Sequence, residues 1–385
     1  MRSQGRLQTQ AAFCFAWRAG HRACWEKHSP RTGYPTKLLP EKRSPMMSFK
    51  CAFLGCGPRA NGHAAAYDHI TRGRKVACCD LDPDRLSAFA AKYEIPATYT
   101  SLEEMLDKEK PDLVHMVTRP NLRVGLMQQL ADAGVPAVLV EKPICIGADD
   151  YKALRSLDAT TKTKYAVNHQ LRYHPQILSL LQDVQDGKFG QVQFIDASAV
   201  LPMSGQGVHV LDLLFAFNGY APVKTVFGAS SGYTDMNCEH PSPVDAETML
   251  TFENGVRAAL QAGAGSPVFE EGATWAHKRI AVYGTHGYFH WRMYAWEKSL
   301  PDGTVERGKK DYGAEDVLGQ ANLTNAIFDW IENDKQAAPT NLQASLDEWL
   351  VILAGYLSSI EARPINFPFD PPDDLLDQFK RFSGA

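Results

Sequence analysis

The stretch Lys50-Cys-Ala-Phe-Leu54, followed directly by Gly55-Cys-Gly57-Pro-Arg-Ala60, decides the fold of the first half of this chain. The first five residues form a short apolar run, which is typical of a buried strand in a parallel sheet. The next six match the pattern G-x-G-x-x-A, in which each small residue has a task. Gly55 permits a tight turn, Gly57 lets the backbone approach a pyrophosphate, and Ala60 lets a helix pack closely on the strand. This pattern predicts a dinucleotide-binding turn.

An acidic residue follows at the distance expected for a ribose-binding carboxylate. The run Lys75–Cys79 is typical of a second strand, and Asp80 comes directly after it, 23 residues beyond Gly57. A carboxylate there accepts hydrogen bonds from ribose hydroxyls and repels a 2′-phosphate. Because the next residue is Leu81 and not an arginine, the sequence favours NAD over NADP. The alternative role, a helix cap on the surface, suits Asp82 better, because that residue precedes a proline.

Strands and helices continue to alternate in units of about 25–30 residues. The stretches 112–117 and 137–140 are strand-like, 122–133 is helical, and Ser101 is placed to cap a short helix. This alternation predicts an α/β domain with a doubly wound parallel sheet and right-handed crossovers.

Polar motifs follow two of these strands, where ligands bind in open parallel sheets. They are Thr118-Arg-Pro-Asn121 and Glu141-Lys142-Pro143. The candidate cofactor contacts are therefore Gly55, Gly57, Pro58, Arg59, Asp80, Thr118, Asn121 and Glu141.

The Glu141-Lys-Pro143 motif after a late strand, together with Gly55-x-Gly57-x-Arg59, resembles the Gfo/Idh/MocA oxidoreductases, which include glucose–fructose oxidoreductase and inositol dehydrogenases. The resemblance runs from about residue 48 to residue 368. Further motifs of the family follow in order, at 167–175, 187–192, 207–212 and 282–287. The resemblance implies a second, α+β domain with an open, mostly antiparallel sheet, whose uncovered face commonly forms a subunit interface. A homodimer or homotetramer is therefore expected.

The residues of the second half of the chain support this expectation independently of the resemblance. Strand-like stretches occur at 191–201, 225–233, 247–252, 255–262 and 279–283, and long helices are predicted at 321–332 and 342–362. We predict an N-terminal extension over residues 1–47, a dinucleotide-binding domain over 48–166, a substrate and oligomerisation domain over 167–370, and a tail over 371–385.

Two residues are candidates for catalysis. A lysine can exchange protons near neutral pH only if burial or a nearby cation lowers its pKa. Lys142 follows a strand end in the expected cleft, and the resemblance implies that it contacts the substrate hydroxyl and takes part in proton transfer; the alternative is an exposed lysine paired with Glu141. His209 begins an apolar helical run, Val208–Phe217, so it could be a packed histidine. The resemblance implies a catalytic partner, either as general base or as the group that orients the hydroxyl.

One departure from the family bears on the proton path. Many of these dehydrogenases carry an aspartate four residues before the histidine, and this chain has Gly205 there. Candidate substrate contacts that could compensate are His169, Arg172 and Tyr173, each of which could equally face the core. Asp212, one turn after His209, is expected to serve helix packing or orientation.

Residues 1–45 differ from the rest, with nine Lys or Arg against two acids and no steady period. Such a segment is expected to stay disordered. It could be an organelle transit segment, or sequence upstream of a true start at Met46 or Met47, which we favour; a secretory signal is a third possibility.

Composition limits the partners. The net charge of −4 over 385 residues gives no reason to expect nucleic acid, and no apolar run approaches the length of a membrane span. The eight cysteines show no zinc-ligand spacing, so we expect reduced thiols, no metal and a cytoplasmic location.

The sequence thus predicts an NAD(P)-dependent oxidoreductase acting on a secondary hydroxyl of a sugar, glycoside or cyclic polyol. Two alternatives remain open. One is a bound NAD used for redox-assisted elimination, hydrolysis or epimerisation, and the other is a non-catalytic dinucleotide sensor.

Overall fold

The computed structural model describes residues 48–236, 240–269 and 271–384. Contacts within the chain group residues 46–385 into one compact unit, and only this unit is described below. The predictions about an N-terminal extension concern residues that lie outside the described part of the chain.

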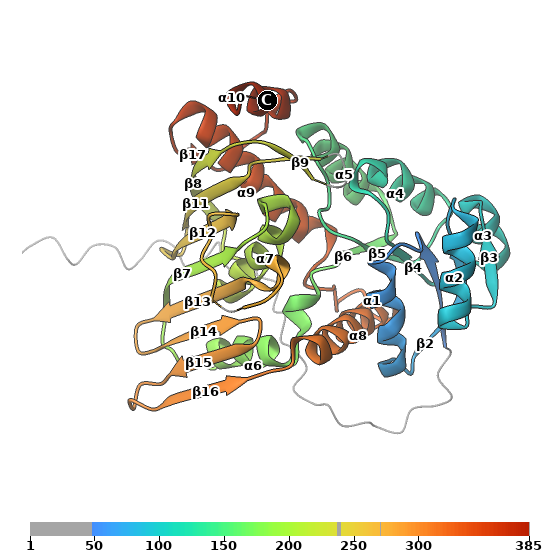
Figure 1. Ribbon diagram of the computed structural model, residues 1–385, viewed down its shortest axis with the longest axis horizontal. Helices are drawn as coiled ribbons and strands as arrows, with labels where there is room; N and C mark the ends of the chain where they lie inside the picture. Colours follow the sequence, from blue (N-terminus) through green and yellow to red (C-terminus); the bar gives the residue numbers. More distant parts are fainter. Residues whose placement is uncertain (1–47, 237–239, 270, 385) are drawn as a thin grey trace, which may run out of the picture. The chain divides into compact units, whose positions relative to one another are not determined.

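Six parallel strands form the first sheet (Figure 1). They are β1 (Phe49–Leu54), β2 (Gly73–Cys79), β3 (Ala97–Tyr99), β4 (Leu113–Met116), β5 (Ala137–Val140) and β6 (Lys164–Val167). Their order is β3-β2-β1-β4-β5-β6, so the direction of winding reverses between β1 and β4. Ligands bind at such a reversal, outside the carboxyl ends of the strands. The predicted doubly wound sheet is confirmed.

Helical segments connect these strands: α1 (Ala60–Ala65), η1 (Ala66–His69), α2 (Pro83–Tyr93), α3 (Leu102–Glu109), η2 (Pro120–Leu122), α4 (Arg123–Asp132) and α5 (Ala148–Thr160). Both predicted caps are present. The Asp82 carboxylate accepts hydrogen bonds from the amides of Asp84 and Arg85, at 3.1 and 3.0 Å, and the Ser101 hydroxyl accepts one from the Glu104 amide at 3.3 Å. These caps satisfy amides that the first helical turn leaves without partners.

The second sheet has nine strands in the order β16-β15-β14-β13-β7-β12-β11-β8-β17. Every neighbouring pair is antiparallel except β7 and β12, so the mostly antiparallel sheet is confirmed. The strands are β7 (Val192–Ala199), β8 (Val223–Ser231), β11 (Asp245–Phe252), β12 (Arg257–Gly263), β13 (Lys278–Gly284), β14 (Tyr288–Arg292), β15 (Ala295–Ser299), β16 (Val305–Lys309) and β17 (Ile365–Asn366). A separate pair, β9 (Thr234–Met236) and β10 (His240–Ser242), follows β8.

Helices pack on one face of the second sheet. They include α7 (Val208–Phe217) and α9 (Leu342–Glu361), while η3 (Gln170–Tyr173) and α6 (Pro175–Gln185) lead from β6 into the sheet. Burial alternates along β11, which shows that its other face is exposed. On that exposed face Phe227 and Met249 lie directly opposite each other in β8 and β11, with 43% and 49% of their surfaces accessible.

Helix α8 (Tyr312–Glu332) begins at Tyr312, well before the predicted start at Ala321, and it packs on the first sheet although the chain reaches it only after β16. The Phe328 ring stacks on Phe49 of β1 with 4.4 Å between the ring centres. The stretch predicted as a tail contains α10 (Leu375–Phe382), whose Phe379 stacks on Tyr356 of α9. Across the described ranges, no helix has the length and apolar character that a bilayer span requires.

Candidate active site

The glycine turn after β1 has the geometry that a bound pyrophosphate needs. Gly55 has φ +90°, and a Cβ there would lie 2.4 Å from the Val117 carbonyl oxygen, so only glycine fits. A Cβ on Gly57 would meet nothing within 4 Å, which means that this backbone faces open space at the carboxyl end of β1. Ala60 is fully buried under the start of α1. Pro58 lies between these positions in the same turn.

The carboxylate of Asp80 is tied to this turn. One oxygen accepts a hydrogen bond from the Cys56 amide at 2.7 Å and the other accepts one from the Asp82 amide at 2.9 Å. Arg85 donates to both oxygens, at 2.9 and 2.5 Å. Burial acts to raise the Asp80 pKa, but these hydrogen bonds and the Arg85 charge hold it below its ordinary value. The sequence prediction missed Arg85, which lies one helical turn beyond the residue where an arginine was sought.

Two further predicted cofactor contacts follow β4. Thr118 Oγ1 is buried and has no hydrogen-bond partner among the described residues. Asn121 is exposed in η2. A buried hydroxyl without a partner, at the sheet reversal and beside an open glycine backbone, fits a polar ligand such as a dinucleotide.

Glu141 has a different position from the one expected of a cofactor contact. Its Oε1 accepts hydrogen bonds from Arg59 Nε at 2.7 Å, His63 Nε2 at 2.9 Å and Asn168 Nδ2 at 2.7 Å, and Oε2 accepts one from the Lys142 amide at 3.2 Å. Burial would raise the Glu141 pKa, but the Arg59 and His63 interactions hold it well below its ordinary value. The predicted cofactor contacts Glu141 and Arg59 thus bind each other, and Glu141 organises the site from inside.

A buried hydrogen-bonded network of polar side chains extends from Glu141 to Tyr67. His63 Nδ1 lies 3.0 Å from His115 Nδ1, and Tyr67 donates its hydroxyl hydrogen to His115 Nε2 at 2.8 Å. With a proton on His63 Nε2 and on His115 Nδ1, every one of these contacts has a donor and an acceptor. Burial lowers the pKa of both histidines, so both are neutral. No motif in the sequence indicated this hydrogen-bonded network.

Lys142 reaches across to the second sheet's helical layer. Its Nζ donates a hydrogen bond to the Gly205 carbonyl oxygen at 2.7 Å. Gly205 lies in η4 (Met203–Gly207), directly before α7. The backbone of this chain therefore offers Lys142 an acceptor at the very position where many family members carry an aspartate.

His209 and His169 lie together beside Lys142. Their rings are perpendicular with 5.6 Å between the centres, and the Nδ1 atom of each is buried without a hydrogen-bond partner in the described part of the chain. Burial first, and the Lys142 charge second, lower the His209 pKa well below its ordinary value. Burial lowers the His169 pKa to about 4. Both rings are therefore neutral at physiological pH.

Arg172 and Tyr173 are not placed to meet a substrate. Arg172 is fully buried, donates to both carboxylate oxygens of Asp212 and lies 3.7 Å from Glu348 Oε1. Tyr173 packs in the apolar core with residues of α8. Of the two alternatives left open for these residues, substrate or core, their burial favours the core. Asp212 contacts Arg172, which fits the orienting role expected of it.

Glu348 on α9 was not predicted. Its Oε2 lies 3.8 Å from His169 Nε2, and burial, with the Asp212 charge second, raises its pKa well above the ordinary value. His169, Asp212 and Glu348 offer ligand atoms within 4.8 Å of one another. The Arg172 guanidinium already supplies the positive charge of this cluster, which leaves little electrostatic reason for a metal ion.

Lys278, the first residue of β13, is a second lysine near the site and, unlike Lys142, it is buried. It is 3% exposed, and its Nζ donates a hydrogen bond to the Trp275 carbonyl oxygen at 2.6 Å. Burial first, and repulsion from Lys142 second, lower its pKa to about 7. The sequence carried a signal for it, because Lys278 alternates with Ile280 and Val282 and therefore points to the buried face of the strand.

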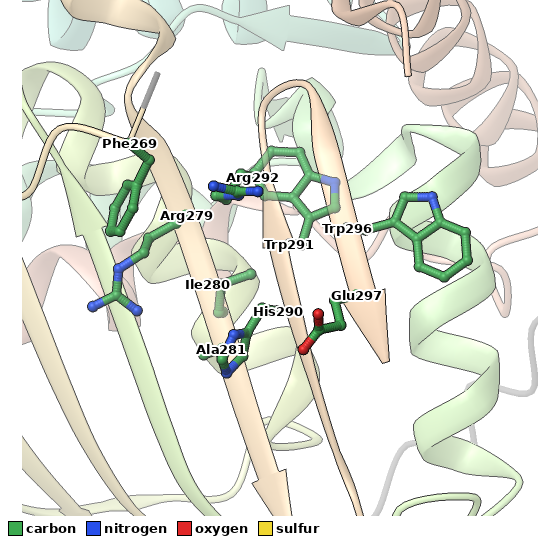
Figure 2. Close-up of a pocket in the computed structure, with 9 residues that line it drawn as sticks. All are labelled: Phe269, Arg279, Ile280, Ala281, His290, Trp291, Arg292, Trp296 and Glu297. Carbon is green, nitrogen blue, oxygen red and sulfur yellow. The ribbon is translucent and has the colours of Figure 1, made fainter. Parts of the chain in front are cut away.

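A separate hollow of about 320 Å³ lies on β13, β14 and β15 (Figure 2). Figure 2 shows Arg279, His290 and Glu297 among the side chains that line it. None of the predicted site residues lines this hollow. It belongs to the second sheet and not to the carboxyl ends of the parallel strands.

Together, the strand order, the glycine turn and the acidic residue after β2 define a dinucleotide-binding protein with a Rossmann domain and a second, antiparallel sheet. Residues 49–169 match the sequence model of the GFO_IDH_MocA family, described as an oxidoreductase family with an NAD-binding Rossmann fold. The first domain of the chain thus matches the Gfo/Idh/MocA oxidoreductases, the family that its motifs resemble.

Two curated relatives and one solved structure show the extent of the similarity. D-apiose dehydrogenase of Paraburkholderia graminis is 27% identical over 245 residues, which are 58% of this chain and 63% of that protein. Inositol 2-dehydrogenase of Rhizobium meliloti is 28% identical over 150 residues, 39% of this chain and 44% of that protein. The matches thus span less than two thirds of either relative.

An oxidoreductase from Agrobacterium radiobacter, solved with NAD+, L-tartaric acid and magnesium, has a TM-score of 0.72 at 18% identity and covers 83% of this chain and 98% of its own. This likeness extends the shared fold over both sheets.

The buried neutral histidines make stability depend on pH. When the pKa of a histidine is lower in the folded than in the unfolded protein, the unfolded state binds more protons below pH 6.5. The free energy of unfolding therefore decreases as the pH falls from 6.5 toward the folded pKa. For His169, with a folded pKa of about 4, this loss at pH 5 is about 2 kcal/mol. Glu348 acts in the opposite direction, because its raised pKa favours the folded state at low pH.

We therefore expect His169→Gln to reduce the loss of unfolding free energy between pH 7 and pH 5 by about 2 kcal/mol, as measured by urea denaturation. His69→Gln is the matched control, because His69 is exposed. An unchanged pH dependence in His169→Gln would show that His169 is protonated in the folded protein.

Proposed function

We propose that this protein is an NAD-dependent dehydrogenase that oxidises a secondary hydroxyl of a sugar, glycoside or cyclic polyol, or reduces the corresponding ketone. The observation that carries the proposal is the position of Lys142, which follows β5 at the edge of the sheet that holds the glycine turn and reaches Gly205 beside His209. The names of the two curated relatives support the substrate class.

NAD, when bound, supplies the carbon that accepts a hydride from the substrate. The open backbone at Gly57, the Thr118 hydroxyl and the Asp80 carboxylate are the residues proposed to hold it. Lys142 is proposed to hold the substrate hydroxyl, because a cation next to that oxygen stabilises the negative charge that develops as the hydride leaves. A neutral His209 donates a hydrogen bond from its ring N–H to the same hydroxyl oxygen and orients it.

Two alternatives use the same site. Redox-assisted elimination, hydrolysis or epimerisation would oxidise the substrate transiently and return the hydride, so no reduced cofactor would accumulate. A dinucleotide sensor would bind cofactor without turnover. Net formation of NADH separates dehydrogenation from both, and product analysis by mass spectrometry separates the remaining two.

The direct test is NADH absorbance with a panel of sugars and cyclic polyols that includes D-apiose and myo-inositol. With the best substrate, Lys142→Met and His209→Ala should each lower kcat by about 10²–10⁴ and leave the Kd for NAD nearly unchanged, because the cofactor contacts lie elsewhere. Lys162→Met, at an exposed lysine of the first domain, should keep wild-type rates. More than about a tenth of the wild-type rate in Lys142→Met would contradict the proposed role.

We also propose that the protein prefers NAD to NADP, because the Asp80 carboxylate repels a 2′-phosphate. Calorimetry should show tighter binding of NAD to the wild type. Asp80→Ala should reduce or invert the preference, because it releases the Arg85 guanidinium that Asp80 now holds. The double variant Asp80→Ala/Arg85→Ala should lose that gain for NADP. Tighter binding of NADP by the wild type would contradict the proposal.

The exposed face of the second sheet is proposed to join two copies of the chain, as a homodimer or within a homotetramer. Phe227 and Met249 present a paired apolar surface there, and water-exposed apolar surface of this kind commonly marks an interface. Met249→Lys should shift the mass measured by light scattering toward the monomer. Phe382→Lys, on α10, is the control. A monomeric wild type would contradict this arrangement.

A further inference from the structure

Oxidation of an alcohol requires a group that takes the hydroxyl proton, and the usual candidates in this site are already engaged. Gly205 stands where an aspartate would serve. Glu141 accepts four hydrogen bonds from its neighbours, and Asp212 is paired with Arg172. The pKa of His209 is so far below neutral that it is a poor base. A different proton acceptor is therefore needed.

Lys278 lies on the strand that runs beside the Gly205 segment. In the register of the second sheet it pairs with Ala199, the last residue of β7, and the chain continues from Ala199 directly into the segment that contains Gly205. The Val200 amide donates to the His277 carbonyl at 3.2 Å, which fixes the start of β13 against this segment. The Gly205 carbonyl, which accepts the hydrogen bond from Lys142, is therefore joined to the backbone of Lys278 through β7 and its hydrogen bonds to β13.

Two aromatic rings lie near the Lys278 amine. Its Nζ lies 5.8 Å from the centre of the Trp275 ring and 5.9 Å from that of Tyr312, which is on α8. Within the described ranges, no carboxylate lies within ion-pairing distance of Nζ, and the one hydrogen bond goes to the Trp275 carbonyl.

The titratable and charged groups near Lys278 come from four other segments. They are Arg59 at the glycine turn, Lys142 after β5, His209 on α7 and Asp316 on α8. His277 is its neighbour on the chain. Asp316 favours the charged amine, but it is itself held by His174, Gln170 and Tyr312. The cations Arg59 and Lys142 therefore disfavour a second ammonium at Lys278.

We propose that Lys278 is a catalytic residue, and that Lys142 and Lys278 form a two-lysine unit that shares one proton and takes the place of the absent aspartate. This inference rests on the proposed dehydrogenase function. The burial of Lys278 opposite the end of β7, which leads into the Gly205 segment that holds Lys142, carries it, and the lowering of the Lys278 pKa to about 7 supports it. Two like charges in a dry site rarely both ionise, so one lysine stays an amine while the other stays an ammonium.

The step balances with the cofactor that the proposed function supplies. The substrate C–H bond breaks and its electron pair leaves as hydride to NAD+, which is reduced to NADH. The O–H bond breaks, its electron pair forms the second bond of the ketone, and its proton goes to the neutral amine of Lys278. The Lys142 ammonium remains beside the oxygen. Ketone reduction runs the same transfers in reverse.

The first experiment needs neither cofactor nor substrate. Acetic anhydride at limiting concentration should label Lys278 with a midpoint near pH 7, as read by peptide mass spectrometry. In Lys142→Met the Lys278 midpoint should move upward, because the repulsion is removed. A midpoint above pH 9, or no labelling at all, overturns the proposal, because an amine that a small reagent cannot reach cannot receive a substrate proton.

The second experiment measures turnover with NAD and the best substrate of the panel. Lys278→Met should lower kcat for oxidation by about 10²–10⁴ and remove the ionisation near pH 7 from the pH profile. Lys278→Arg should also be slow, because a guanidinium keeps its proton. Lys224→Met should behave as wild type.

The outcomes separate the two proposals. A Lys278→Met enzyme that keeps its rate and pH profile, or that changes only KM, overturns the role of Lys278 as proton acceptor. A wild type that reduces no NAD with any substrate of the panel overturns the proposed dehydrogenase, whatever the labelling shows.

Discussion

The site depends on one buried negative charge, the carboxylate of Glu141. A carboxylate removed from water is costly unless hydrogen bonds and opposite charge surround it, and here Arg59, His63, Asn168 and the Lys142 amide do so. These partners come from the glycine turn, α1, the end of β5 and the end of β6. One charge therefore fixes where three strand ends lie relative to one another, and it fixes the backbone from which the Lys142 side chain reaches Gly205.

Each cation of the site is held by a different acceptor. Arg59 is held by Glu141 and Lys142 by the Gly205 carbonyl, while Lys278 is held by the Trp275 carbonyl. A carbonyl orients an ammonium without cancelling its charge, so the two lysines still repel each other. An aspartate at position 205 would neutralise this repulsion. The glycine found there leaves this repulsion in place, and burial together with the repulsion lowers the Lys278 pKa.

Local sequence signals predicted most of the fold. The G-x-G-x-x-A turn, the caps at Asp82 and Ser101, and the alternation of strands and helices depend on neighbours within a few residues, and they are present as expected. The candidate site was predicted less completely. Lys142 and His209 lie together, but Glu348 and Lys278 owe their positions to contacts between distant segments. Arg85 contacts Asp80 only five residues away, and it was missed because only the residue directly after Asp80 was considered. Arg172 illustrates the limit, because nothing near it in the sequence reveals that Asp212 and Glu348 enclose it.

The position of α8 has a consequence for how the chain is made. Residues 312–332 are synthesised after eight of the nine strands of the second sheet, yet Leu323, Ile327 and Phe328 share the apolar core of Cys51, Phe53 and Ala60 in the first. A ribosome-bound chain that has released only the first six strands still lacks part of that core. Its early domain therefore carries uncovered apolar surface through much of translation, a period in which chaperones have a binding site that the finished protein no longer offers.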